Sequence, residues 1–162
     1  MVGTQRAMLV TRVGAVLCAF SIEDVVETMR PLPIEPIGHA SDPALAAIAG
    51  VAMIRGAAVA VVDARKLLGV AASGAEPARR FVVVRSAAHR IALAVDAVID
   101  VRRIDRAALS RLPPLLEAAN RASVAAIGGR DEGLLVVLDA VRLLPEAGWR
   151  AIGMPDARGS MP

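Results

Sequence analysis

The chain consists of short apolar runs separated by turn-forming residues. The runs are rich in valine and isoleucine, and each is about five to eight residues long, the length and composition typical of β-strands. Helix-length periodicity is scarce. The pattern predicts nine strands, over residues 7–13, 16–20, 51–55, 58–62, 81–85, 91–95, 98–102, 125–128 and 134–138. We therefore expect a mainly all-β fold with short helices.

The sequence also contains an internal repeat. VVDARKLL at 61–68 recurs as VLDAVRLL at 137–144, an offset of 76 residues. VTRVGAVLCAFSIEDVVE at 10–27 resembles VVRSAAHRIALAVDAVID at 83–100, an offset of 73 residues. Two blocks in the same order at nearly the same offset indicate two like halves. Several short strands per half favour a small closed or nearly closed barrel, because closure removes exposed sheet edges. The repeat therefore predicts two barrels.

The repeat predicts how the chain is divided. We expect one domain over 1–144, made of barrel subdomains at about 7–68 and 80–144. The segment GVAASGAEPARR at 69–80 is small, polar and proline-containing, so it is interpreted as the linker between them. Residues 145–162 lie beyond the repeat and are expected to form a flexible C-terminal tail.

Two aspartates occupy equivalent places in the repeat. Asp63 and Asp139 each follow an apolar run and precede a short segment that ends in Leu-Leu. A carboxylate at such a place can accept hydrogen bonds from the free amides of a helix's first turn, so we interpret both as N-caps. The alternative is a pair of catalytic carboxylates. It is the one feature of the sequence that would support an enzyme.

Composition narrows the class of protein. With 56% hydrophobic and 22% charged residues among 162, the chain has the apolar surface that a folded core requires. No uncharged apolar run reaches the ~18 residues of a membrane-spanning helix, and no secretory signal is visible. Cys18 is the single cysteine, which excludes an internal disulfide and fits a reducing cytoplasm.

Sequence signatures of catalysis and metal binding are missing. There is no glycine–lysine pair of a phosphate-binding loop and no GxSxG motif. The glycine-rich GGRDEG at 128–133 stands between two strand-like runs and is interpreted as a hairpin turn. His39 and His89 have no cysteine or histidine at metal-ligand spacing. We expect no enzyme activity, no cofactor and no metal.

The basic character of the chain comes from arginine. The formal net charge is only +3, although the calculated pI is about 10.3. Nucleic-acid binding favours a focused basic stripe with aromatic platforms, and only Phe20, Phe81 and Trp149 are aromatic. The densest basic stretch is interleaved with Asp100 and Asp105 and is interpreted as a solvated face; it contains Arg102, Arg103, Arg106 and Arg111. We expect no nucleic-acid partner, with a nucleic-acid-binding small barrel as an alternative.

Four segments together resemble the CheW-like family of chemotaxis coupling proteins. GVAMIRGAAVAVVDARKLLG at 50–69 is similar to the family's Gly-Val-hydrophobic-Asn-Leu-Arg-Gly turn and the strand that follows it. FSIEDVVETMR at 20–30 resembles its Val-x-Glu segment, and RIALAVDAVIDV at 90–101 resembles its second-barrel strand pair. Residues 134–144 resemble its closing strand and helix, so the resemblance covers about residues 7–144.

The resemblance implies two joined five-stranded barrels and a cytoplasmic, non-enzymatic adaptor. Such an adaptor bridges the cytoplasmic tip of a methyl-accepting chemoreceptor to the regulatory domain of a CheA-type histidine kinase, without inserting into the membrane itself. A groove between the barrels would hold a receptor helix, with apolar burial and a few charges setting the register. Carried over by motif, the partner-binding residues are Val25, Glu27, Gly50, Arg55, Gly56, Val98 and Val101.

Each of these residues has an assigned role and a structural alternative. Arg55 would be the polar anchor, Gly50 and Gly56 would permit its turn, and Val25 and Glu27 would flank it. Val98 and Val101 would form the facing apolar wall. The alternatives are core packing for the valines, backbone geometry alone for the glycines, and an internal ion pair with Glu27 for Arg55.

The sequence departs from the family pattern at three positions. Met53 stands where the family has asparagine, Ala60 where it has proline, and Thr28 where it usually has a bulky aliphatic residue. Methionine in place of a polar turn residue removes hydrogen bonds and adds apolar contact area. A divergent adaptor of another chemosensory-type pathway, controlling pili or gliding, therefore remains an alternative.

Overall fold

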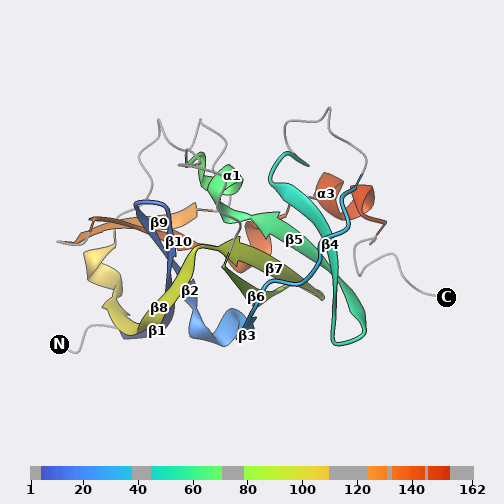
Figure 1. Cartoon of the computed structure of the whole chain (residues 1–162). Helices are drawn as coiled ribbons and strands as arrows, with labels where there is room; N and C mark the ends of the chain where they lie inside the picture. The colour runs from blue at the N-terminus through green and yellow to red at the C-terminus, as the bar shows by residue number, and fades with distance from the viewer. Residues whose placement is uncertain are drawn as a thin grey trace.

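Two five-stranded sheets lie side by side in the computed structural model (Figure 1). The structure describes residues 5–37, 45–70, 79–109, 124–130, 133–144 and 146–153. Sheet A has the strand order β8-β1-β2-β10-β9, and sheet B has the order β3-β6-β7-β5-β4. The strands are β1 (Gln5–Val13), β2 (Val16–Ser21), β3 (Val25–Met29), β4 (Ile48–Ile54), β5 (Ala57–Asp63), β6 (Arg80–Ser86), β7 (His89–Val95), β8 (Ala97–Asp105), β9 (Val124–Arg130) and β10 (Gly133–Leu138).

Helical segments are short and connect or cover the strands. They are the 3₁₀ turns η1 (Ile22–Asp24), η3 (Arg106–Ala108) and η4 (Ala140–Arg142), and the α-helices α1 (Ala64–Leu68) and α3 (Glu146–Ala151). Within the described residues, none of the helices is both long and apolar enough to cross a membrane. The expectation of a mainly β fold with short helices is confirmed.

All nine predicted strands are present, and β3 is an additional one. The segment VVETM of β3 pairs with β6 alone and lies at the edge of sheet B. Its side chains are half-buried or exposed, so its sequence shows neither a continuous apolar run nor a clean alternation. The glycine-rich segment 128–133 joins β9 to β10, with Arg130 paired to Gly133, as expected for a hairpin; residues 131 and 132 lie outside the described residues.

The sheets do not coincide with the two sequence halves, which corrects the predicted subdomain boundaries. Sheet A combines β1 and β2 of the first half with β8, β9 and β10 of the second. Sheet B combines β3, β4 and β5 with β6 and β7. The chain crosses from sheet A to sheet B through η1 and returns between β7 and β8. The hairpins β1–β2 and β6–β7 are therefore exchanged between the halves.

The strand orders of the two sheets follow the sequence repeat. Adding five to each strand number in sheet B, counted cyclically, converts its order into that of sheet A. The equivalent pairs β2–β10 and β7–β5 are parallel, whereas the hairpin pairs are antiparallel. The predicted linker, 69–80, therefore connects α1, which follows β5, to β6 of the same sheet. Its residues 71–78 lie outside the described part of the chain.

The sheets bury three groups of apolar side chains. Strands in the middle of each sheet are covered on both faces, so alternate residues enter different groups. On β6, Phe81 and Val83 face a sheet B core, whereas Val82 and Val84 face a central core between the two sheets. A sheet A core contains Met8, Val10, Leu17, Ala19, Ile104, Leu135 and Val137. This double burial explains why these strands appear in the sequence as continuous apolar runs.

The strand ladders leave both sheets open. Among the described residues, no ladder joins β8 to β9 or β3 to β4, the edge strands of sheets A and B. In sheet B, however, the chain after β3 reaches the opposite edge. The backbone of Glu35 donates to and accepts from that of Val51 on β4, at 2.8 and 2.9 Å. The predicted five-stranded units are thus present, with sheet B partly closed by this bridge.

The C-terminal segment includes a packed helix, which corrects the prediction of a flexible tail from residue 145. α3 places Trp149 in the central core, where its side chain is only 7% exposed. Its ring stacks on that of His89, with ring centroids 4.4 Å apart. Indole burial provides a large apolar area, and this area holds the segment against sheet B.

Candidate functional site

Arg55 occupies the tip of the β4–β5 hairpin. Ile54 pairs with Ala57, so Arg55 and Gly56 form a two-residue turn, and both have positive φ, 50° and 80°. Two consecutive positive φ values are typical of the type I′ turn that suits the twist of antiparallel strands. A Cβ on Gly56 would meet nothing within 4 Å. The glycine therefore serves the turn's backbone, as predicted, and the turn exposes Arg55.

The Arg55 guanidinium pairs with Glu27 of β3 through two hydrogen bonds. Nε donates to Oε1 at 2.9 Å, and Nη2 donates to Oε2 at 2.7 Å. The bidentate geometry matches the planar fork of guanidinium to the two carboxylate oxygens. The Arg55 side chain is nevertheless 73% exposed. The internal pairing considered for Arg55 is present; its guanidinium lies at the surface, whereas the Glu27 side chain is only 19% exposed.

The pair affects the protonation of both groups. The hydrogen bonds from Arg55 hold the pKa of Glu27 below its usual value, with a smaller contribution from the charge of Arg90, and they raise the pKa of Arg55. Because the pKa of Glu27 is lowered on folding, the pair is complete above the ordinary carboxyl pKa. It is lost as the pH falls through the lower pKa of the folded protein.

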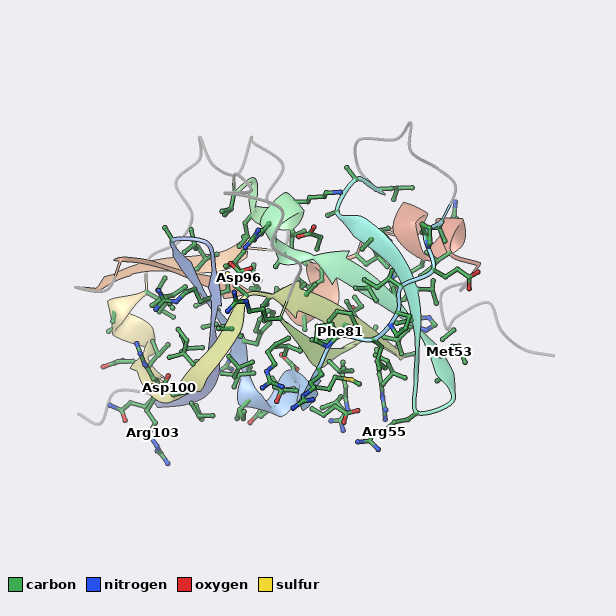
Figure 2. All side chains as sticks on the ribbon, in the orientation of Figure 1. Met53, Arg55, Phe81, Asp96, Asp100 and Arg103 are labelled. Carbon is green, nitrogen blue, oxygen red and sulfur yellow. The ribbon has the colours of Figure 1, made fainter. Side chains whose placement is uncertain are left out.

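The pair also connects opposite edges of sheet B. Glu27 belongs to the edge strand β3, and Arg55 caps the hairpin that contains the other edge strand, β4. Figure 2 shows Arg55 projecting from the lower side of the molecule, on which Asp100 and Arg103 of β8 also lie. Arg55 and Glu27 therefore form one polar unit at the end of sheet B.

Gly50 is remote from this turn, which corrects the role inferred for it. It lies within β4 with a φ of 149°, where the register shifts between Ile48 and Gly50. A Cβ at this position would be 2.1 Å from the carbonyl oxygen of Glu35. Glycine is required because the bridging backbone of Glu35 crosses β4 there.

Two of the three predicted valines pack at the junction of the sheets. Val25 on β3 and Val98 on β8 are half-buried and contact the central core. Val101 pairs with Leu9, a central-core residue, and therefore lies on the same face of sheet A. Its side chain is 55% exposed. Val101 is thus an apolar surface residue, whereas Val25 and Val98 also serve as core.

Met53 is an exposed apolar residue that the motif-based set did not include. It is 62% exposed on β4, while its neighbours Ala52 and Ile54 are buried in the sheet B core. It lies two residues before Arg55 on β4, and its adaptable thioether side chain is on the face opposite to Ala52 and Ile54. In the sequence, the exposed methionine was indicated by its departure from the asparagine of the family pattern at position 53.

Asp96 is a second residue that sequence reasoning missed. It lies between β7 and β8, where the chain crosses from sheet B to sheet A. Its Oδ2 accepts from the backbone N of Gly14 in the β1–β2 turn at 2.7 Å, and its Oδ1 accepts from Nε of Arg65 on α1 at 3.0 Å. The Asp96 and Arg65 side chains are about one-fifth exposed. Asp96 thus connects the two sheets.

We expect Asp96→Ala to lower the free energy of unfolding by about 2 kcal/mol, because it leaves the Arg65 guanidinium and the Gly14 amide half-buried without this acceptor. The matched control is Asp100→Ala, which removes the 2.9 Å ion pair with Arg102, in which Asp100 is 47% exposed. Its effect should stay within ~0.5 kcal/mol. Urea titration of both variants measures the difference, and equal effects would contradict the role of Asp96.

The paired aspartates make structural contacts. The carboxylate of Asp63 accepts from the backbone N of Arg65 at 2.9 Å and of Lys66 at 3.4 Å, which confirms it as the N-cap of α1. Asp139 precedes η4, and its Oδ2 lies 3.6 Å from Nε of Arg142. In the described part of the chain, no group of three or more His, Cys, Asp or Glu side chains is arranged to hold a metal ion.

Two of three comparisons with known proteins found a match. The family model of the CheW-like domain matches residues 7–148. Among solved structures, the chain is similar to the scaffolding protein TtCheW from Thermoanaerobacter tengcongensis, with 24% sequence identity and a TM-score of 0.73. The match covers 90% of this chain and 96% of that one, and it shows the shared fold. No curated protein matches the sequence.

Proposed function

The chain belongs to the CheW-like domain family, and on this basis we propose that it is a non-enzymatic adaptor of chemosensory signalling. In this role it connects the cytoplasmic tip of a chemoreceptor to the regulatory domain of a CheA-type histidine kinase. It acts in the cytoplasm and joins membrane receptor arrays through its partners. The proposal requires a surface that recognises protein and no catalytic centre.

The observation that carries the proposal is the exposed Arg55–Glu27 unit. The hairpin holds Arg55 at the surface, and Glu27 holds the guanidinium in one orientation. A side chain ordered before binding loses less entropy when a partner arrives. The donors of the guanidinium that do not face Glu27 are available to carbonyl or carboxylate oxygens of a docking helix.

Exposed apolar residues supply further area for docking. Met53 and Val101 are the most exposed of the large apolar residues that the structure describes. Val25 and Val98 are half-buried at the junction of the sheets. An amphipathic helix recognised in this way buries its apolar face, and polar residues set its register. Gly50 and Gly56 contribute only by shaping β4 and its turn.

Arg55→Ala tests the proposal. We expect the unfolding midpoint to change little, as is typical of an exposed ion pair, while the affinity for a receptor-tip fragment falls roughly thirtyfold, the size of an interface hot spot. Arg55→Lys should retain only part of the affinity, because a point charge does not reproduce the bidentate geometry of guanidinium. Isothermal titration calorimetry and thermal unfolding measure the two quantities.

Two further variants sharpen this test. Glu27→Gln removes the carboxylate that orients Arg55 and should also weaken binding. Arg80→Ala removes an exposed arginine at the end of β6 remote from the β6–β7 turn and should not. A large loss of stability with unchanged affinity of the folded fraction would make Arg55 a purely structural residue. Absence of binding between the unmodified protein and both the receptor tip and the kinase domain would refute the adaptor role.

The exposed Met53 favours a divergent partner within the same class of pathway. An interface that meets this side chain gains apolar contact where the family pattern has a hydrogen-bonding asparagine. Adaptors that serve pili or gliding rather than flagella would differ in this way. Met53→Asn should therefore lower the affinity of the protein for its own receptor tip. The same calorimetric titration measures this affinity.

A further inference from the structure

Two exposed arginines lie directly opposite each other at the β6–β7 hairpin. Arg85 pairs with Arg90 in the antiparallel register, one step before the turn at Ala87. Neither guanidinium forms a hydrogen bond or ion pair with any residue that the structure describes, although the charge of Arg90 acts on Glu27. The β6–β7 hairpin therefore carries two adjacent positive charges without a bonded counter-ion in the described structure.

Both side chains lie on the same face of sheet B. Arg85 continues the row of Phe81 and Val83, and Arg90 continues the row of Ala92 and Ala94. Both rows line the sheet B core. The two arginines thus extend from the end of that core into solvent.

The same end of the sheet carries the Arg55–Glu27 unit. β5 and β7 are parallel, with Ala60 opposite Ile91, so the β4–β5 and β6–β7 turns lie at one end. Glu27 pairs in register with Val83 and therefore shares this face. Arg55 pairs with Glu27, and the charge of Arg90 also acts on this glutamate. The other acidic residues nearby in sequence, Glu23 and Asp24 of η1, make no ion pair with Arg85 or Arg90.

Folding alone does not account for the arginine pair. Like charges directly opposite on neighbouring strands destabilise a sheet, and Arg85 has no compensating bond in the described structure. An opposite charge supplied from outside would convert this repulsion into attraction. The pair is therefore suited to a ligand with two negative groups a short distance apart.

We infer that the partner helix docking at this end of sheet B presents two carboxylates one helical turn apart to Arg85 and Arg90. Opposite side chains on paired strands have Cβ atoms about 5 Å apart, and residues four apart on a helix have Cβ atoms about 5–6 Å apart. The two spacings match. This inference rests on the proposed function and adds the chemistry of the partner: an acidic receptor helix.

The test compares Arg85→Thr/Arg90→Thr with the control Arg80→Thr, which changes an exposed arginine at the other end of β6. Threonine favours strands, so the double variant should be at least as stable as the unmodified protein. Its affinity for a receptor-tip fragment should fall roughly tenfold at 0.05 M salt and differ little at 0.5 M, because exposed ion pairs are screened. The control variant should bind like the unmodified protein. A gain in stability with a loss of affinity is not expected of a structural pair.

A second probe needs no receptor. An alanine-based helical peptide with two glutamates four residues apart should shift the amide NMR signals around residues 85 and 90 in a salt-sensitive manner, and its glutamine counterpart should not. If these signals shift but the receptor tip does not bind, the acidic-ligand surface stands and the adaptor role fails. If the receptor tip binds the double variant as tightly as the unmodified protein, the inference is overturned while the adaptor role stands. Tighter binding of a 20-base-pair DNA duplex than of the receptor tip, lost in the double variant, would also overturn it.

Discussion

Gly50→Ala is expected to destabilise the protein by about 4 kcal/mol or more, the range reached when a core backbone position is sterically blocked. A Cβ at residue 50 would be 2.1 Å from the carbonyl oxygen of Glu35 and 2.8 Å from Cγ2 of Ile34. The φ of 149° adds strain for any side chain. Relief requires the 35–51 backbone bridge to move, which removes two hydrogen bonds across the edges of sheet B. Circular dichroism during urea titration measures the loss.

Gly56→Ala is the matched control for Gly50→Ala. Its φ of 80° is also positive, but a Cβ there would meet nothing within 4 Å. The cost should therefore be about 1 kcal/mol, the conformational term alone. If both variants lose the same stability, the close approach of Glu35 is not what requires glycine at position 50.

Trp149→Ala is expected to cost about 3–5 kcal/mol, the range for deleting a large buried aromatic side chain. The indole lies in the central core with Leu143 and Leu144 and stacks on His89. Trp149→Phe retains part of the buried area and should cost about half as much. Circular dichroism is the suitable probe, because Trp149 is the single tryptophan and its fluorescence disappears with the substitution.

A surface substitution provides the comparison for Trp149. Val101→Ala removes apolar atoms of a side chain that is 55% exposed. It should change the free energy of unfolding by no more than ~0.5 kcal/mol. A chain shortened to residue 145 should behave like Trp149→Ala or worse. If the shortened chain is as stable as the full one, the packing of α3 contributes nothing, and the original expectation of a flexible tail is correct after all.

The sequence by itself determined the strands and caps whose cause lies in neighbouring residues of the chain. Strands that are buried on both faces require continuous apolar residues, so β6 and β7 were predictable from runs such as Phe81–Val84. Asp63 was predictable as an N-cap, since the capping bond spans only two or three residues. β3 was not, because its half-buried side chains leave no clear alternation.

The candidate site was partly predictable. The motif containing Arg55 and Gly56 indicated a turn that exposes an arginine, and the family resemblance indicated Glu27. The role of Gly50 could not be deduced, because the atom that excludes a side chain there belongs to Glu35, fifteen residues earlier in the chain. Arg85 and Arg90 were also missed, since two charges five residues apart become neighbours only through the hairpin register.

The tertiary structure alone decided which strands share a sheet. The sequence determined that the chain is duplicated, and the matching strand orders of the two sheets agree with this. It did not determine that hairpins β1–β2 and β6–β7 are exchanged, because a hairpin has the same local pattern in either sheet. The choice depends on parallel pairing of β2 with β10 and of β5 with β7, and on burial of one face of each strand in a shared central core. These contacts join residues far apart in sequence, so no local pattern records them.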